Sequence, residues 1–416
     1  MTTALPSAGA LAGVRVLDLS RVLAGPWATQ ILADLGAEVV KIEHPQGGDD
    51  TRGWGPPFVE REDGSRDAAY YFVANRNKRS VALDISRPEG QEAVRRLAAQ
   101  SQVLVENFKL GGLAKYGLDY DSLRQVNPAL VYCSVTGFGQ TGPDARRPGY
   151  DYLIQGRSGL MSITGQPDGQ PGAEPMKVGV ATSDLSAGLY ATIGILAALR
   201  HAERTGEGQH LDISLLDCQV SLLANQAQNY LVSGKTPVRL GNAHPNVAPY
   251  QVFESADGYL ILAVGNDRQF AAFCREAGVP ALSEDPRFAR NADRVANREA
   301  LAEVIQPLMH QRRSDDWFRA LEAASVPCGP INSIDKVFED PQVLARDMRL
   351  DMPLPNGASI PQVASPLRLS ATPPRYRAAP PSLGEHTAEV LAELGMGTGD
   401  STEPNLPTTD TEKPHA

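Results

Sequence analysis

Short apolar runs alternate with amphipathic stretches along the first half of the chain. The apolar runs predict strands, which are Val14–Leu19, Glu38–Glu43, Gln102–Glu106, Leu130–Val135 and His210–Leu215. The amphipathic stretches predict helices between them, one with Pro26 in its first turn and Gly36 just past its end, then Pro88–Gln100 and Asp121–Val126. Because strands that alternate with helices form right-handed βαβ units, we expect an α/β fold with a doubly wound, mostly parallel, Rossmann-like sheet.

The pattern changes in the second half of the chain. Helices are predicted at Leu185–Glu203 and Asp217–Leu231, and the pattern of hydrophobic and polar residues changes near Gly234. A hairpin follows, in which Val252–Glu254 and Tyr259–Val264 flank the turn Ala256-Asp257-Gly258. Further helical spacing occurs at Phe270–Ala277, Arg298–His310, Asp315–Ala324 and, after a Pro-rich stretch, Glu385–Leu394. This half therefore predicts a smaller α+β unit that is followed by a segment with little regular secondary structure.

Composition narrows the possible partners. The chain has 416 residues, 42% hydrophobic and 21% charged, with a formal net charge of -10. Such acidity disfavours nucleic acid and anionic membranes, and an anionic small molecule would need a local basic cluster. The four cysteines form no CxxC pair, so we expect reduced thiols and no metal site. No signal peptide is visible and the longest apolar stretch, Leu189–Leu199, is short, so we expect a cytoplasmic protein.

The first strand-to-helix turn argues against a bound dinucleotide. It reads Ser20 to Pro26 and contains one glycine, whereas close approach to a pyrophosphate uses three. The GxxxxGK[ST] pattern of nucleoside triphosphate sites is also missing from the sequence. NAD and ATP are therefore disfavoured as cofactors.

Asp184 is the most informative candidate for chemistry. It lies where the strand-like run from Val178 ends and a long apolar helix begins. One interpretation is a helix N-cap, in which the carboxylate accepts backbone N–H bonds. The other is a nucleophile that attacks an activated acyl group, with free N–H groups stabilising the oxyanion. Local sequence supports both interpretations.

A series of motifs resembles the class III (CaiB/BaiF-type) CoA-transferases from about Leu11 to Leu394. The motifs are Val16–Leu19 with Ala24-Gly25-Pro26, Leu35–Glu43, Asn77–Ser80 with Leu83-Asp84, Val105–Phe108, Ser134–Gly139, Gly149-Tyr150-Asp151, Val178–Gly188, Thr205–Gly208 and Val326–Pro330. Each is weak alone, but their order and spacing are specific. The resemblance implies that Asp184 is the catalytic carboxylate and that the reaction passes through an aspartyl anhydride and an aspartyl-CoA thioester. It also implies no permanent cofactor, no metal, and a homodimer of interlocked chains.

The resemblance places the CoA site at a set of positions spread over the first half of the chain. They are Leu23, Ala24, His44, Leu83, Ser86, Asn107, Phe108, Lys109, Lys115, Tyr150 and Asp151. Each also has an ordinary interpretation, since lysines are commonly solvated and Phe108 would suit a core. The basic run of Arg76, Lys78 and Arg79 also has two interpretations, a phosphate contact and a solvated face.

Two departures bear on the substrate. Oxalate-type members, an alternative within the family, resemble this chain but carry a polar amide at the position of Leu23 and a glycine-rich segment at Gly241–Tyr250. His44 also replaces an arginine. The segment after Gly241 resembles succinyl-CoA:dicarboxylate CoA-transferases, which act on glutarate and hydroxymethylglutarate. A dicarboxylate needs a partner for its remote carboxylate, and the candidates are Arg21, Arg239, Asn242 and His244.

α-Methylacyl-CoA racemases are the alternative from another reaction class. They share the fold but carry a histidine at the position of Tyr150, and a tyrosine with an ordinary pKa near 10 is a poor base at neutral pH. A non-catalytic CoA-binding subunit has no support, because Asp184 is present.

The predicted domain layout combines the pattern of residues along the chain with what the family resemblance implies. It consists of a first part of a large CoA-binding α/β domain at 1–200, a linker helix region at 201–229, a small α+β domain at 230–330, a return segment that completes the large domain at 331–396, and a disordered tail at 397–416.

Overall fold

A computed structural model describes residues 9–61, 64–354 and 357–397, and the predicted tail from 398 onward lies outside the described residues. Contacts divide the chain into two compact units. Unit 1 contains residues up to Ile154, Ala181–Leu222 and those from Asp347 onward, and unit 2 contains Gln155–Val180 and Leu223–Arg346. The predicted domain boundaries stay predictions.

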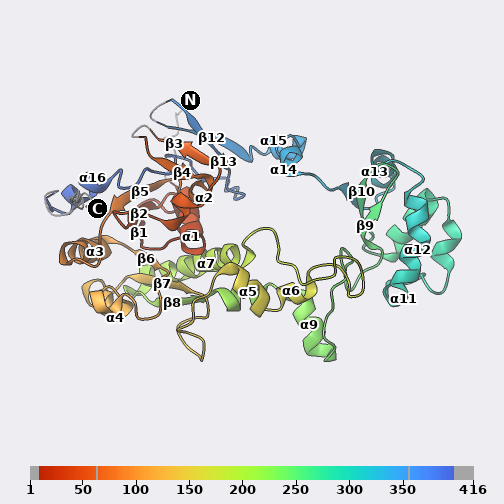
Figure 1. Ribbon diagram of the computed structural model, residues 1–416, viewed down its shortest axis with the longest axis horizontal. Helices are drawn as coiled ribbons and strands as arrows, with labels where there is room; N and C mark the ends of the chain where they lie inside the picture. Colours follow the sequence, from red (N-terminus) through yellow and green to blue (C-terminus); the bar gives the residue numbers. More distant parts are fainter. Residues whose placement is uncertain (1–8, 62–63, 355–356, 398–416) are drawn as a thin grey trace, which may run out of the picture. The chain divides into compact units, whose positions relative to one another are not determined.

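Unit 1 is built on a six-stranded parallel sheet, which confirms the predicted fold class (Figure 1). Its strands, in spatial order, are β5 (Lys78–Ala82), β2 (Glu38–Glu43), β1 (Arg15–Asp18), β6 (Val103–Glu106), β7 (Val131–Thr136) and β8 (His210–Ser214). The chain adds β2 and β5 on one side of β1, and then β6, β7 and β8 on the other. The order therefore reverses between β1 and β6.

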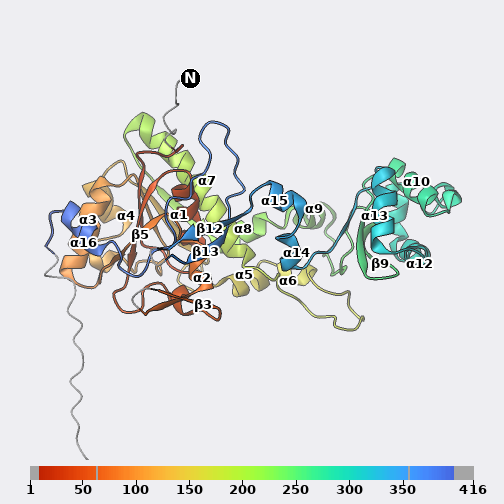
Figure 2. The same cartoon turned by 90° about the horizontal axis from the view of Figure 1, so that it is seen from above.

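Helices cover both faces of this sheet (Figure 2). Alternate strand residues point to opposite sides, so Val16 joins one core and Leu17 the other. The first core contains α1 (Ala24–Asp34), α7 (Thr182–Thr205) and α8 (Leu215–Ser221). The second contains α3 (Pro88–Gln100), α4 (Tyr120–Val126) and α16 (Thr387–Glu393), so the C-terminal segment completes unit 1.

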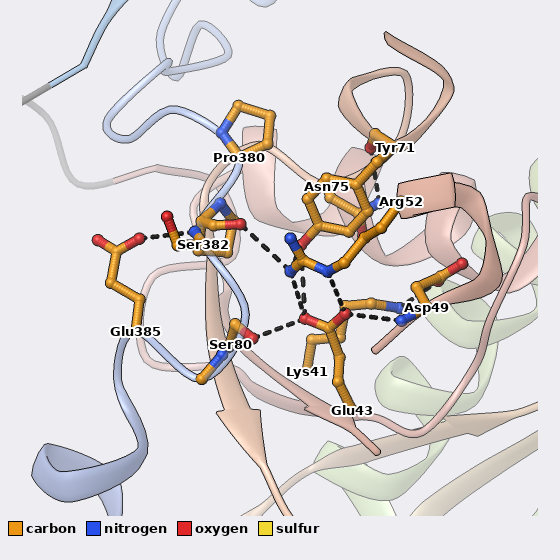
Figure 3. A network of polar contacts seen from close by, with 12 residues as sticks. Lys41, Glu43, Asp49, Arg52, Tyr71, Asn75, Ser80, Pro380, Ser382 and Glu385 are labelled. Carbon is orange, nitrogen blue, oxygen red and sulfur yellow. Dashed lines mark hydrogen bonds and ion pairs between the residues drawn. The ribbon is translucent and has the colours of Figure 1, made fainter. Parts of the chain in front are cut away.

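Smaller elements complete unit 1. They are β3 (Phe58–Glu60), β4 (Arg66–Ala68), α2 (Ala69–Phe72), the hairpin β12 (Arg349–Pro353) with β13 (Ser359–Val363), and the single-turn helices at Asp50–Gly53 and Ala114–Tyr116. A buried polar network ties the C-terminal segment to the sheet, because Arg52 donates both to Glu43 on β2 and to the carbonyl of Pro381 (Figure 3).

Unit 2 has its own antiparallel sheet and core. The strands are β9 (Tyr250–Glu254), β10 (Tyr259–Ala263) and β11 (Cys328–Pro330), with β10 in the middle. The helices are α6 (Leu160–Ile163), α9 (Ala224–Ser233), α10 (Asp267–Glu276), α11 (Asn291–Ala296), α12 (Arg298–Met309), α13 (Ser314–Ala323), α14 (Ile334–Val337) and α15 (Pro341–Ala345), with a single turn at Pro280–Glu284. α5 (Asp151–Arg157) spans the boundary between the units. The predicted hairpin and helices of this region are confirmed.

One prediction about local structure was wrong, and the structure bears on two interpretations that the sequence left open. The helix expected at Asp217–Leu231 is interrupted at Leu222–Leu223 and forms α8 and α9. The basic run is not a solvated face throughout: Arg76, just before β5, is buried against Asp34, and Lys78, the first residue of β5, is buried against Asp18, whereas Arg79 is partly exposed and pairs with Glu393. Asp184 is not the N-cap of α7, because that position is Ala181 and Asp184 is the third residue of the helix.

Within the described part of the chain, α7 is the one helix long and apolar enough to cross a membrane by length and composition. Half of its most apolar window is buried, and it packs against α1 and the sheet. This packing is that of a core helix of unit 1.

Candidate active site

A cavity of about 550 Å³ lies in unit 1, and we call it the strand-end cavity. Its walls come from the segments that follow the carboxyl ends of the six parallel strands, including Arg21–Ala24 after β1 and Asn107–Lys109 after β6. These two segments follow the strands between which the sheet order reverses, where ligands bind in open α/β sheets. The fold thus places a ligand site here before any side chain is considered.

Most predicted site residues line this cavity. They are Arg21, Leu23, Ala24, His44, Ser86, Asn107, Phe108, Lys109, Lys115, Tyr150 and Asp184. Two CoA-site candidates have other positions: Leu83 is buried in the second core, and Asp151 binds the start of α7. Arg239, Asn242 and His244 belong to unit 2.

Asp184 enters the cavity from the first turn of α7. The Ser183 N–H in the same turn donates to Asp151 Oδ1 at 2.8 Å, so the carboxylate of Asp151 satisfies a helix N-terminal donor in the way expected of a cap residue. Asp184 is left to face the cavity. Burial, and then the charge of Asp151, raise the pKa of Asp184 from 3.8 to about 7.

Close helix packing holds Asp184 beside the first strand-to-helix turn. Gly188 lies one turn after Asp184 on α7, and a Cβ on it would come within 2.7 Å of the Ala24 carbonyl oxygen and 3.0 Å of the Trp27 ring. Residues four apart share a helix face, so Asp184 and Gly188 both face the start of α1. The glycine therefore allows the catalytic candidate and the cavity wall to approach one another.

The cavity is locally basic although the chain is acidic. Its cationic or titratable basic side chains are Arg21, His44, Lys109, Lys115, Arg146 and Arg147. Some have partners: Arg21 pairs with Asp50 at 3.2 Å and lies over the Phe108 ring, and Arg147 pairs with Asp144 at 3.1 Å. This cluster is the local feature that an anionic ligand requires.

The structure adds residues that the sequence did not single out. Asp50, Tyr116, Thr136, Gly137, Arg146 and Arg147, which were not among the predicted site residues, also line the cavity. The signal for Thr136 and Gly137 was available, since they directly follow a predicted strand. Tyr70 was missed as well; burial and then the charges of Asp184 and Asp151 raise the pKa of its phenol, which keeps a neutral hydroxyl near the two carboxylates.

The described side chains around the cavity do not resemble a metal centre. Within residues 9–61, 64–354 and 357–397, no group of three or more His, Cys, Asp or Glu side chains is placed to hold a metal ion. The cavity contains the partly desolvated carboxyl group of Asp184 in the first turn of α7, with basic side chains around it. Such a site suits nucleophilic attack by a carboxylate on an acyl group of an anionic ligand.

Comparisons with known proteins find similar chains over most of this length. The model of CoA-transferase family III matches residues 11–387. A succinate–glutarate CoA-transferase of Agrobacterium fabrum is 56% identical over 385 residues, covering 92% of this chain and 95% of the relative. The human succinyl-CoA:glutarate CoA-transferase is 42% identical over 384 residues, covering 92% and 86%. A crystal structure of a CaiB/BaiF family protein from Brucella suis aligns with a TM-score of 0.82 and 51% identity, covering 93% of this chain and all of that one.

Proposed function

This chain belongs to CoA-transferase family III, and we propose that it transfers CoA from succinyl-CoA to a short dicarboxylate such as glutarate, with Asp184 as the covalent nucleophile. The observation that carries the proposal is the Asp184 carboxyl group, raised in pKa and facing a basic cavity at the carboxyl ends of the strands. Three relatives are a succinate–glutarate or a succinyl-CoA:glutarate CoA-transferase, which supports the choice of substrates.

The reaction begins with attack on the donor. The Asp184 carboxylate attacks the thioester carbonyl of succinyl-CoA, the C–S bond breaks, and a mixed anhydride and CoA thiolate form. The thiolate then attacks the aspartyl carbonyl, which gives an aspartyl-CoA thioester and releases succinate. Partial burial of Asp184 favours these steps because an anhydride exposed to water would hydrolyse.

The acceptor repeats the sequence in the opposite direction. Its carboxylate attacks the aspartyl thioester and displaces the thiolate, which in turn attacks the acceptor carbonyl of the new anhydride. The product is the acceptor's CoA thioester, and the Asp184 carboxylate is regenerated. The chemistry calls for no redox step.

We propose that Arg21 binds the remote carboxylate of the dicarboxylate. Of the four candidates from the sequence, Arg21 lines the strand-end cavity, and its ion-pair partner Asp50 is half exposed. Arg239 belongs to unit 2 and is not among the residues that line the cavity. The Arg21 side chain can exchange Asp50 for a substrate carboxylate at little cost, since exposed ion pairs are weak.

The test of the function is an exchange assay. Succinyl-CoA is incubated with isotopically labelled glutarate in deuterated water, and the products are identified by mass spectrometry. Transfer predicts labelled glutaryl-CoA and free succinate, with no deuterium at the α-carbon of the thioester. α-Deuteration without transfer would instead support racemase chemistry.

We further propose a cytoplasmic homodimer. Large apolar side chains are exposed on α7 (Leu189, Tyr190, Ile193 and Leu196) and on α9 (Tyr230, Leu231 and Val232). On each helix, taken by itself, neighbouring exposed apolar side chains mark an interaction surface, and a second copy of the chain would cover it. Light scattering that gives the mass of a single chain at micromolar concentration would overturn this proposal.

A further inference from the structure

The residues Arg21–Leu23 form part of the wall of the strand-end cavity. Side chains from other positions bind the backbone here at three consecutive residues, Ser20, Arg21 and Val22. The Ser20 N–H donates to Asp18 Oδ1 at 2.9 Å, and Lys41 Nζ donates to the Ser20 carbonyl at 2.7 Å. Asn107 accepts from the Arg21 N–H at 2.9 Å and donates to the Arg21 carbonyl at 2.7 Å. The Val22 N–H donates to the carboxylate of Asp49, with both oxygens at 3.2 Å.

Val22 needs this restraint because its backbone is strained. Its φ is +71°, in the left-handed region that a β-branched residue rarely adopts. Strained backbone of this kind persists where surrounding contacts over-determine it, and it is concentrated at functional sites. The contact that holds the strained residue itself is the one from Asp49.

Asp49 is in turn fixed by a buried network (Figure 3). Lys41 Nζ donates to it at 2.9 Å, and Thr51 donates through both its N–H, at 3.0 Å, and its hydroxyl, at 2.7 Å. The side chains of Lys41 and Asp49 are fully buried. The Asp49 N–H also donates to Glu43 at 3.0 Å, which connects this pair to Arg52. Asp49 therefore has little freedom to move away from Val22.

We propose that Asp49, oriented by Lys41 and Thr51, is a positioning residue for CoA transfer: it holds Val22 in its strained conformation and so preforms the cavity wall beside Asp184. Asp49 acts through the backbone of Val22, which does line the cavity. The wall leads directly into the start of α1, against which Gly188 and hence Asp184 pack. A shift of the segment would thus change the geometry at the nucleophile. The inference rests on the proposed transferase function.

The competing explanation is that the buried charges only stabilise the fold, and Asp67 provides a matched control for it. Asp67 is a buried carboxylate of the same network, but it binds Arg52 at 2.9 Å and Arg61 at 2.8 Å. Asp49→Asn and Asp67→Asn each remove one buried negative charge. Loss of stability is expected from both, whereas loss of positioning is expected from Asp49→Asn.

The experiment measures Tm, kcat and KM for succinyl-CoA in wild type and both variants, well below each Tm. We expect Asp49→Asn to lower kcat by about ten-fold to a hundred-fold, the scale of a small misplacement of reacting groups, while Asp67→Asn lowers Tm and keeps kcat. Equal kcat in the two variants would overturn the inference. An inactive wild type would instead refute the proposed function.

Two further variants separate positioning from folding. Glycine adopts a positive φ without strain, so Asp49→Asn should cost less kcat in a Val22→Gly background than in wild type, a coupling that a stability role does not produce. If Asp49→Asn does not fold, Thr51→Val carries the test, because it removes one bond to Asp49 and leaves its charge. A kcat for Thr51→Val equal to that of Asp67→Asn would then overturn the inference.

Discussion

At the scale of single residues, the environment of Asp184 decides its chemistry. A carboxyl group with a pKa near 7 is costly to ionise in the folded protein, and its carboxylate is correspondingly more basic than a solvated one. The sequence located this residue but could not choose between cap and nucleophile. The choice depends on Asp151, 33 positions earlier in the chain, whose contact with the Ser183 N–H takes over the capping role.

The raised pKa predicts how activity depends on pH. Only the ionised Asp184 can attack the thioester, so kcat/KM for succinyl-CoA should rise with pH and level off above about 7. Steady-state rates across this range test the prediction. A profile that is already flat at pH values near 4.5 would mean that Asp184 ionises normally or is not the nucleophile.

The same shift predicts a trade-off between activity and stability. A folded-state pKa raised from 3.8 to about 7 means that the native protein binds the proton more tightly, so stability present below 3.8 is lost as the pH rises to about 7. At about 1.4 kcal/mol per pKa unit, the loss is on the order of 4 kcal/mol. Asp184→Asn should therefore be inactive, yet have a higher Tm than wild type above pH 7 and a smaller difference in acid. An equal or lower Tm at high pH contradicts this prediction.

At the scale of elements, the sequence predicted helices and strands that local patterns define, and it missed structure that depends on partners far away in the chain. β2 and α3 have the predicted boundaries, because apolar periodicity and flanking residues define them. β5 was read as a basic run, since its Lys78 reaches a buried partner, Asp18, that lies 60 positions away. The strand-end loops were within reach of prediction, whereas Arg146 and Arg147 belong to a loop without a local pattern.

The packing of α7 on α1 predicts the effect of added side chains. Gly188→Ala places a Cβ 2.7 Å from the Ala24 carbonyl, so the helices must separate, with a cost of about 1–3 kcal/mol in unfolding free energy and a lower kcat. Gly194→Ala is the matched control on the same helix, because its nearest neighbour is the flexible end of Leu211 at 3.2 Å. Alanine there should be neutral or stabilise by up to about 1 kcal/mol. Denaturant unfolding and kcat measure both; equal effects at the two glycines would contradict this packing.

At the scale of the whole molecule, a chain with a net charge of -10 concentrates basic side chains at one cavity. CoA carries several phosphate charges, so salt should lower kcat/KM for succinyl-CoA by screening this attraction. Lys109→Ala should reduce both kcat/KM and its salt dependence, whereas Lys235→Ala, in unit 2, should change neither. An identical salt dependence in wild type, Lys109→Ala and Lys235→Ala would show that the cavity's charge does not attract succinyl-CoA.

The most direct test of the mechanism follows oxygen atoms. If glutarate labelled with ¹⁸O in its carboxylates is turned over with succinyl-CoA, each cycle delivers one acceptor oxygen to the Asp184 carboxyl, and the next cycle passes enzyme oxygen to succinate. Mass spectrometry of peptides after turnover should therefore find ¹⁸O in the peptide that contains Asp184, and in free succinate. Efficient transfer with no ¹⁸O in that peptide would contradict a covalent role for Asp184.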